Sequence, residues 1–491
     1  MSSNYREQWT SVGGHFPSHW QFFKLEELLE NAKGIAVGVM YPGDHTAEGI
    51  PLIKVGDVKD GYIASQPSFF ISPEVDEEYK RTRLNGTELL ITLVGNPGDC
   101  VVVEPYMAGW NAARALAVVR LKDTGLREWL KYILLSKPAK HLIDARLNTT
   151  VQKTLNLKDI RELGIPIPPK HERDMIIKNI SAIEQKKIVN ADTNQTLEQM
   201  AQALFKSWFV DFEPVKAKMA VLAAGGSQEE ATLAAMTAIS GKNADALAVF
   251  KREHPEQYAE LKATAELFPL AMQDSELGEI PEGWTLSEIG AQIDIAGGAT
   301  PSTKTPDFWD NGDIHWTTPK DLSNVKDKIL LHTERKITKA GLGKISSGLL
   351  PVNTVLMSSR APVGYLAIAK VPVAINQGYI AMKCNKELSP EFVLQWCSAN
   401  MPEIISRASG TTFAEISKKN FNPIPLVKPP LELVKNYTKQ VSAIYSLIEN
   451  TMRENNSLTE LRDTLLPKLL SGEITLPEAE QAVSEVENVQ S

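Results

Sequence analysis

Cysteine is scarce in this sequence, and its scarcity limits the chemistry that the chain can carry. Only three cysteines occur in 491 residues, Cys100, Cys384 and Cys397. They form no CxxC pair and have no histidine at metal-ligand spacing, so neither a zinc site nor a disulfide framework is expected. We expect all three to be reduced, buried residues of a cytoplasmic protein.

Long apolar runs are also missing. Runs such as LLITLVG (residues 89–95) fall well short of the roughly 20 residues that a membrane helix needs. The Met-Ser-Ser start has no basic stretch followed by an apolar one, so no secretory signal is expected. With 43% hydrophobic and 23% charged residues, the composition is that of an ordinary globular protein, and the length favours two or three domains.

Catalytic motifs are absent as well. The sequence contains no GxxxxGK[ST] phosphate loop, no GxSxG elbow and no HExxH zinc motif. The segments IPPK (residues 167–170) and KPPL (residues 428–431) lack the polar first residue and the aromatic residue with which adenine methyltransferases hold their target. The glycine pair in IAGGATPS (residues 295–302) lacks GxGxxG spacing. We therefore expect a chain that catalyses nothing by itself and binds no cofactor or metal.

The formal net charge of −8 is unevenly distributed. Residues 20–170 carry 19 basic and 19 acidic side chains, and residues 286–430 carry 16 basic and 12 acidic ones. The excess acidity lies in residues 171–285 and after residue 430. We call the first two segments lobe one and lobe two. Their neutral to mildly basic charge permits DNA binding without demonstrating it.

What the sequence does contain is an internal repeat. Residues 181–183 (SAI) recur at 442–444, and the same offset of 261 aligns Asn194 with Asn455 and Leu197 with Leu458. Upstream, GIPIPP (residues 164–169) resembles PIPLVKPP (residues 423–430). The order along the chain is therefore lobe, long helix, lobe, long helix, with the lobes more divergent than the helices.

Each lobe alternates short β-branched runs with Gly, Pro and Asn-Gly turns, and a helical stretch closes it. We predict an α/β (α+β) fold in which each lobe has a curved mixed sheet. In both long helices, apolar residues step by three and four with polar residues such as Asn194 and Asn455 at the centre, which is a heptad seam. Because each helix leaves one lobe for the other, we expect the two to pair antiparallel about a pseudo-twofold axis. The alternative left open is that each helix lies only on its own lobe.

The whole pattern resembles the specificity subunit of type I restriction–modification enzymes. The resemblance rests on QALFKSWFVDFEPV (residues 202–215) with SELGEIPEGW (residues 275–284), on LRDTLLPKLLSGEI (residues 461–474) and on GGATPSTKTPDFWDNGDIHW (residues 297–316). Lobe one, with KGIAVGVMYPG (residues 33–43), departs from the family's opening, so its loop positions are assigned less safely. The domains implied are a first target-recognition domain (1–168), a first long helix (169–212), a central region with an Ala-rich helical insertion (213–283), a second target-recognition domain (284–429), a second long helix (430–475) and an acidic tail (476–491).

The resemblance implies that each target-recognition domain reads one half of a bipartite DNA site and that the helix pair sets the spacing. It implies two methyltransferase subunits that methylate adenine N6 with S-adenosylmethionine, and two motor-endonuclease subunits that use ATP with Mg²⁺. Two alternatives from other classes remain: a self-sufficient DNA modification enzyme, and a coiled-coil scaffold without DNA specificity.

Base readout needs forked donors and acceptors on loops, such as Arg for guanine and Asn or Gln for adenine. Turn and cap chemistry explains any one of these residues equally well, but sets recur at matching places of both lobes. The candidates in lobe one are Lys54, Asp57, Asn96, Asn111, Arg114, Thr149 and Thr150. Those in lobe two are Thr317, Thr318, Lys320, Ser358, Ser359, Arg360, Asn376, Gln377, Thr411 and Thr412.

The leucine-rich and aromatic helix ends have two explanations, which stay open here. They form docking patches for the two methyltransferase subunits, or they seal each helix to a lobe. The residues concerned are Leu204, Phe205, Trp208, Phe209, Leu465, Leu466, Leu469 and Leu470.

Overall fold

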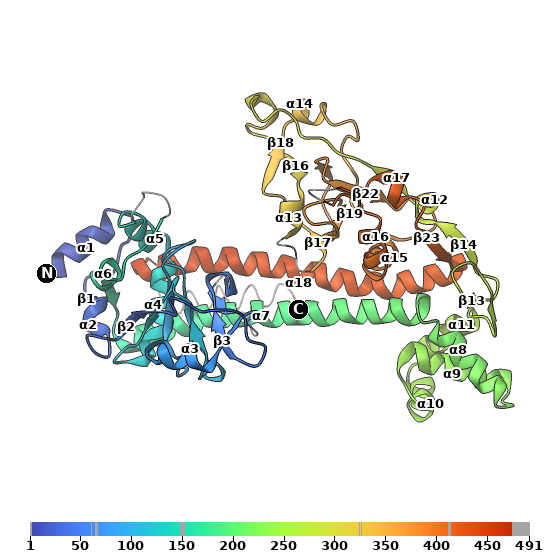
Figure 1. The fold of residues 1–491 in the computed structure, drawn as a ribbon, viewed down its shortest axis with the longest axis horizontal. Helices are drawn as coiled ribbons and strands as arrows, with labels where there is room; N and C mark the ends of the chain where they lie inside the picture. The colour runs from blue at the N-terminus through green and yellow to red at the C-terminus, as the bar shows by residue number, and fades with distance from the viewer. Residues whose placement is uncertain are drawn as a thin grey trace. The chain divides into compact units, whose positions relative to one another are not determined.

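The computed structural model describes residues 2–59, 61–63, 67–147, 153–323, 325, 327–410 and 414–473 (Figure 1). Its internal contacts divide the chain into two compact units. Unit 1 comprises Met1–Ile188 with Asn455–Ser491, and unit 2 comprises Val189–Glu454. The long helices α7 (Lys170–Phe209) and α18 (Leu431–Ser471) each contribute to both units.

In unit 1, lobe one divides its strands among small sheets. β1 pairs antiparallel with β11, the order β2-β10-β7-β8 is antiparallel throughout, and in β6-β3-β9 the central strand pairs parallel with β9. The strands are β1 (Gln21–Lys24), β2 (Ile35–Val37), β3 (Ile50–Ile53), β4 (Val58–Lys59), β5 (Tyr62–Ile63), β6 (Phe70–Ile71), β7 (Leu89–Thr92), β8 (Cys100–Val102), β9 (Asn111–Ala112), β10 (Leu116–Val119) and β11 (Gly164–Ile167). The helices are α1 (Ser2–Thr10), α2 (Leu25–Leu28), α3 (Pro73–Glu78), α4 (Arg127–Leu135), α5 (Lys137–Asp144) and α6 (Leu157–Arg161).

In unit 2, lobe two repeats this topology. β14 pairs with β23 as β1 does with β11, the order β15-β22-β19-β20 matches β2-β10-β7-β8, and β18-β16-β21 matches β6-β3-β9, including the parallel pair. One extra strand, β17, joins β20 in parallel. The strands are β12 (Met272–Gln273), β13 (Ile280–Pro281), β14 (Thr285–Glu288), β15 (Asp294–Ala296), β16 (Ile314–Thr317), β17 (Ile329–Leu330), β18 (Arg335–Ile337), β19 (Val355–Ser358), β20 (Leu366–Ala369), β21 (Val373–Ile375), β22 (Tyr379–Lys383) and β23 (Pro425–Lys428). The helices are α12 (Ile289–Gln292), α13 (Pro319–Ser323), α14 (Lys339–Leu342), α15 (Pro390–Ala399), α16 (Met401–Ser406) and α17 (Lys418–Phe421).

The fold is thus mixed α+β, as predicted, with the strands of each lobe in several small sheets. The apolar runs become the central strands because both of their faces are covered. All four residues of β7, β10, β19 and β20 are buried. In unit 1 the amphipathic helix α4 supplies Trp129, Leu130 and Ile133 to the same core as Leu89 and Ile91 of β7.

The helices α7 and α18 pack on each other within each unit, and the residues that pair run in opposite order along the two helices. In unit 1, Arg462 Nη1 donates to Glu184 Oε1 at 2.8 Å, and Asn455 Nδ2 donates to the carbonyl oxygen of Lys187 at 3.4 Å. In unit 2, the hydroxyl of Thr451 donates to Asn194 and that of Tyr445 to Glu198. The predicted antiparallel pairing is therefore correct.

The Ala-rich insertion of unit 2 is a group of four helices. They share a small core that includes Ala235, Met236 and Leu247, and the buried amine of Lys218 donates to the carbonyl of Phe268 at 2.6 Å. Lys439 and Asn436 of α18 contact the insertion through Glu260 and Thr264. The helices are α8 (Glu213–Ala223), α9 (Gln228–Ser240), α10 (Ala244–Glu253) and α11 (Pro255–Glu266).

Candidate nucleic-acid interface

The candidate DNA-reading residues of lobe two that the structure describes collect at one edge of its sheets. Since β16 and β21 are parallel, their carboxyl ends meet, and the amide of Asn376 donates to the carbonyl of Thr317 at 3.1 Å. The end of β19 joins them, because the amide of Ser359 donates to the carbonyl of Gly378 at 2.8 Å. Three turns distant in sequence therefore form one polar edge.

Not every candidate at this edge faces outward. Thr317, Ser358 and Ser359 are buried; Thr317 lies 3.0 Å from the hydroxyl of Tyr379, and Ser358 donates to the carbonyl of Pro362 at 2.7 Å. Their hydroxyls complete hydrogen bonds of the fold itself, so their placement does not support the predicted contact with bases. These polar residues do lie at strand ends, as predicted, but their hydroxyls stabilise the packing of the strand ends.

The remaining candidates at this edge are exposed or half-buried, and each has a partner within the lobe. The amide and the hydroxyl of Thr318 both donate to a carboxylate oxygen of Asp321, at 2.7 and 2.9 Å. The amine of Lys320 lies 2.9 Å from a carboxylate oxygen of Glu334. Arg360 lies 3.6 Å from Glu415, the Asn376 side chain accepts from the amide of Gly378 at 2.8 Å, and Gln377 accepts from Thr300 at 2.7 Å. The hydrogen bond to Glu334 raises the pKa of Lys320. These partners orient the side chains without burying them.

Lobe one places its candidates at the equivalent edge. Lys54 follows β3 and Arg114 follows β9, its parallel neighbour, while the exposed Asn96 follows β7. The amine of Lys54 lies 3.5 Å from the ring centroid of Phe69, and Asp57 accepts from the amide of Lys54 at 2.7 Å. Arg114 is exposed.

Asn111 is the clear exception in lobe one. It is fully buried, donates to Asp76 at 2.9 Å and accepts from the hydroxyl of Thr82 at 2.8 Å. A side chain so enclosed cannot reach a base, and its role is to join β9 to the segment around α3. The predicted candidates Thr149, Thr150, Thr411 and Thr412 lie outside the described residues.

The leucine-rich and aromatic helix ends are buried inside their own units. Phe205, Trp208 and Phe209 form ring contacts with Phe392 and Tyr437 in the core of unit 2, and Leu204 packs half-buried beside them. In unit 1 the core contains Leu465, Leu466, Leu469 and Leu470. Of the two explanations, sealing of helix to lobe is the one that this packing supports, because a docking patch must be exposed.

Sequence reasoning missed an exposed cation in lobe two. The guanidinium of Arg335 stacks over Trp309, 3.6 Å from the ring centroid, and Trp309 meets Trp316 edge-on at 5.0 Å. Such stacking orients an arginine for contact with a nucleic acid. The only available signal was the aromatic pair in PDFWDNGDIHW (residues 306–316), which by itself is typical of a core.

Across the described ranges, no group of three His, Cys, Asp or Glu side chains is arranged to hold a metal ion. Nor does that part of the chain include a helix with the length and apolar character needed to cross a membrane.

The protein thus has two lobes of one topology, each with a polar edge at matching strand ends. Comparison with known proteins gives the family. Residues 17–199 and 281–460 match the type I restriction modification DNA specificity domain. The chain belongs to this family and is a specificity subunit of a type I restriction–modification system, so the prediction of a subunit without its own catalytic activity is confirmed.

Individual relatives agree. The specificity subunit of the type I restriction enzyme HindI from Haemophilus influenzae is 33% identical over 363 residues, covering 71% of this chain and 78% of that protein. A putative type I restriction enzyme specificity subunit, MjaX, from Methanocaldococcus jannaschii is 22% identical over 469 residues, 94% of this chain and 95% of its own. Among solved structures, the S subunit of the type I system from M. genitalium aligns with 92% of this chain and 96% of its own length, at 15% identity and a TM-score of 0.45.

Proposed function

We propose that lobe one and lobe two each read one half of a bipartite DNA site and that the paired helices α7 and α18 set the spacing. The observation that carries this proposal is that the two lobes share one topology but present different side chains at equivalent edges. Lys54 and Arg114 occupy the ends of β3 and β9, where Thr318 and Gln377 occupy the ends of β16 and β21. One scaffold with two sets of contact residues suits two different half-sites.

The exposed residues divide into two kinds of contact. Gln377, Asn96 and Arg114 carry groups that discriminate bases, whereas Lys320 and Arg360 suit phosphates. The buried Asn111, Thr317, Ser358 and Ser359 are excluded from the proposed interface. The domain limits that follow are those expected from the sequence, with target-recognition domains at 1–168 and 284–429.

The partners belong to the same proposal. The chain assembles with two methyltransferase subunits, which carry S-adenosylmethionine and methylate adenine, and with two motor-endonuclease subunits that use ATP and Mg²⁺. In unit 2, Val189 and Met200 of α7 and Leu447 of α18 are exposed apolar residues, each about half accessible. These exposed residues, and not the buried leucine-rich helix ends, form the docking surface for a methyltransferase. The three unpaired cysteines are consistent with a cytoplasmic location.

The test is methylome sequencing of a host that expresses the intact system, with this chain present or deleted. One split adenine motif should disappear on deletion. Replacing residues 284–429 with lobe two of a relative should change one half of that motif and leave the other half and the spacer unchanged. If methylation persists without the chain, or both halves change together, the proposal is wrong; a scaffold without DNA specificity would give no split motif at all.

A further inference from the structure

Glu198 of α7 is a buried carboxylate with hydrogen-bond donors on several sides. Its side chain is 10% exposed. One oxygen, Oε2, accepts from the hydroxyl of Tyr445 at 2.7 Å. The other, Oε1, accepts from Nε2 of Gln395 at 3.1 Å and from Nε2 of Gln202 at 2.8 Å, and lies 2.8 Å from the amine of Lys328. A buried carboxylate is costly unless it is paired in this way.

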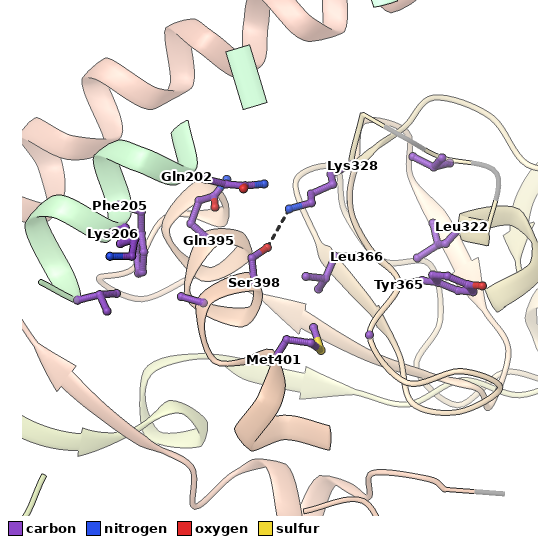
Figure 2. Close-up of a pocket in the computed structure, with 14 residues that line it drawn as sticks. Gln202, Phe205, Lys206, Leu322, Lys328, Tyr365, Leu366, Gln395, Ser398 and Met401 are labelled. Carbon is purple, nitrogen blue, oxygen red and sulfur yellow. Dashed lines mark hydrogen bonds between the residues drawn. The ribbon is translucent and has the colours of Figure 1, made fainter. Parts of the chain in front are cut away.

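The donors come from separate elements of unit 2. Tyr445 belongs to α18, Gln395 to α15 of lobe two, and Lys328 directly precedes β17 of lobe two. One carboxylate on α7 therefore joins the second helix and two points of the lobe. The residues around it line a pocket of about 570 Å³, in which Figure 2 shows Lys328, Gln395 and Gln202 with Ser398.

The backbone at Lys328 gives independent support. Its φ of +52° is in the left-handed region, which a lysine seldom occupies. The amine at the end of this side chain contacts Glu198 and also donates to Ser398 at 3.0 Å. Such a conformation persists where surrounding contacts determine it, and functional positions are where it is commonly found.

Unit 1 has a counterpart. Glu184 of α7 is also buried, accepts from Arg462 of α18 at 2.8 Å and accepts from the hydroxyl of Tyr62 in lobe one. By the offset of 261, Glu184 aligns with Tyr445, so the same repeat position joins helix, helix and lobe in both units. Apolar residues would bury these contacts equally well. Hydrogen bonds are directional, so they permit only one orientation of the lobe on the helices.

We propose that Glu198 is a positioning residue that fixes the orientation of lobe two on the helix pair and thereby the spacer length that the complex accepts. This inference rests on the proposed function, since it presupposes two half-sites. One added base pair moves a half-site by about 3.4 Å and turns it by about 35°. A lobe held by several directional bonds rejects that displacement, and a lobe with fewer of them tolerates it.

The test uses the complete complex of this chain with its methyltransferase subunits, with wild type compared against Glu198→Gln. The glutamine keeps the volume but removes the negative charge that the amine of Lys328 faces, and its amide nitrogen cannot accept the hydrogen bonds that a carboxylate oxygen accepts at that place. Substrates carry the native motif with its own spacer, or with one base pair added or removed. We expect methylation at the altered spacers, relative to the native one, to rise about tenfold, while base preference within each half-site stays as in the wild type. An unchanged ratio overturns the inference.

Two further variants make the result decisive. Glu260→Gln breaks an exposed ion pair between the insertion and Lys439 of α18 that involves no lobe residue, so it should leave the ratio unchanged; an equal rise in this control overturns the inference. If Glu198→Gln does not fold, Tyr445→Phe removes a single hydroxyl from the network and should raise the ratio in the same direction, and no rise overturns the inference. Failure of the proposed function is distinct, because the wild-type complex would then show no split motif.

Discussion

Arg462 of α18 and Glu184 of α7 form an ion pair 2.8 Å long inside unit 1, although they are 278 positions apart in the sequence. Glu184 is 8% exposed and Arg462 is 25% exposed. Since Glu184 also accepts from Tyr62, the pair connects both long helices to lobe one. Asn455, which precedes Arg462 on α18, bonds to Lys187, which follows Glu184 on α7, so the two helices run antiparallel.

Replacing Arg462 with methionine should destabilise unit 1, because the buried Glu184 would lose the closer of its two cations and keep only Lys187, 3.9 Å away. Removing one partner of a buried ion pair costs roughly 3–5 kcal/mol, and the remaining lysine should keep the loss at the low end of that range. Hydrogen exchange of the amides of α18 beyond residue 455 should accelerate accordingly, while the amides of unit 2 keep their rates. The double variant Glu184→Gln with Arg462→Met should recover part of the loss; exchange that accelerates evenly in both units would contradict this account.

The same pair predicts a dependence on pH. Burial raises the pKa of Glu184, but hydrogen bonds from Tyr62 and Arg462 outweigh it, so that the pKa lies below the ordinary glutamate value. A carboxyl with a lower pKa in the folded state stabilises fully above its unfolded pKa of about 4.3 and loses this contribution as pH falls through the folded value. The difference in unfolding free energy between wild type and Glu184→Gln should therefore be constant from pH 5 to 7 and shrink below about pH 4. A difference that grows on acidification would have the wrong sign.

Asn111 and Asn96 offer a crossed test of which polar residues serve the fold and which serve DNA. Asn111→Ala removes a donor to Asp76 and an acceptor for Thr82, so stability should fall by roughly 1–3 kcal/mol. Asn96→Ala alters an exposed side chain and should change stability by less than about 0.5 kcal/mol. Base preference should respond in the opposite way, with a change for Asn96→Ala and none for Asn111→Ala. Urea unfolding and motif sequencing of methylated DNA measure the two effects.

The sequence predicted the repeat, the α+β class and the long helices because these depend on repeated segments and on hydrophobic periodicity. It predicted the antiparallel pairing because each helix leaves one lobe for the other. It did not separate Asn96 from Asn111, since both are asparagines beside a β-branched run and only the tertiary packing buries one of them. The heptad seam also missed Glu184, Glu198 and Tyr445. Each follows a seam position by one residue, at Ile183, Leu197 and Ile444, where a lobe covers a helix face that two helices alone would leave in solvent. These side chains are buried only because two helices and a lobe meet there, and the sequence pattern of one helix does not show this.

Variants in one lobe should affect base preference in only one half-site of the DNA. Arg114→Ala changes an exposed arginine of lobe one and Gln377→Ala an exposed glutamine of lobe two. Each should relax preference at one position of one half-site by roughly 1–3 kcal/mol and leave the other half intact. The control Arg252→Ala removes an exposed cation of the insertion and should change neither half. Methylation of randomised half-site libraries gives the readout, and relaxation of both halves by a single variant would show that the lobes do not read independently.

Docking of the methyltransferase should depend on the outer faces of the helices in unit 2. Met200 of α7 and Leu447 of α18 are 54% and 47% exposed, so each leaves a large apolar side chain in solvent. A glutamate at either position places a charge on a surface that must lose water when a partner binds. Met200→Glu and Leu447→Glu should therefore weaken methyltransferase binding at least tenfold without altering the melting of the free chain. Val249→Glu, at an apolar residue of the insertion with comparable exposure (42%), is the matched control and should bind as the wild type does. Calorimetric titration of each variant with the purified methyltransferase decides the matter: equal affinities across all three would place the docking surface elsewhere on the chain.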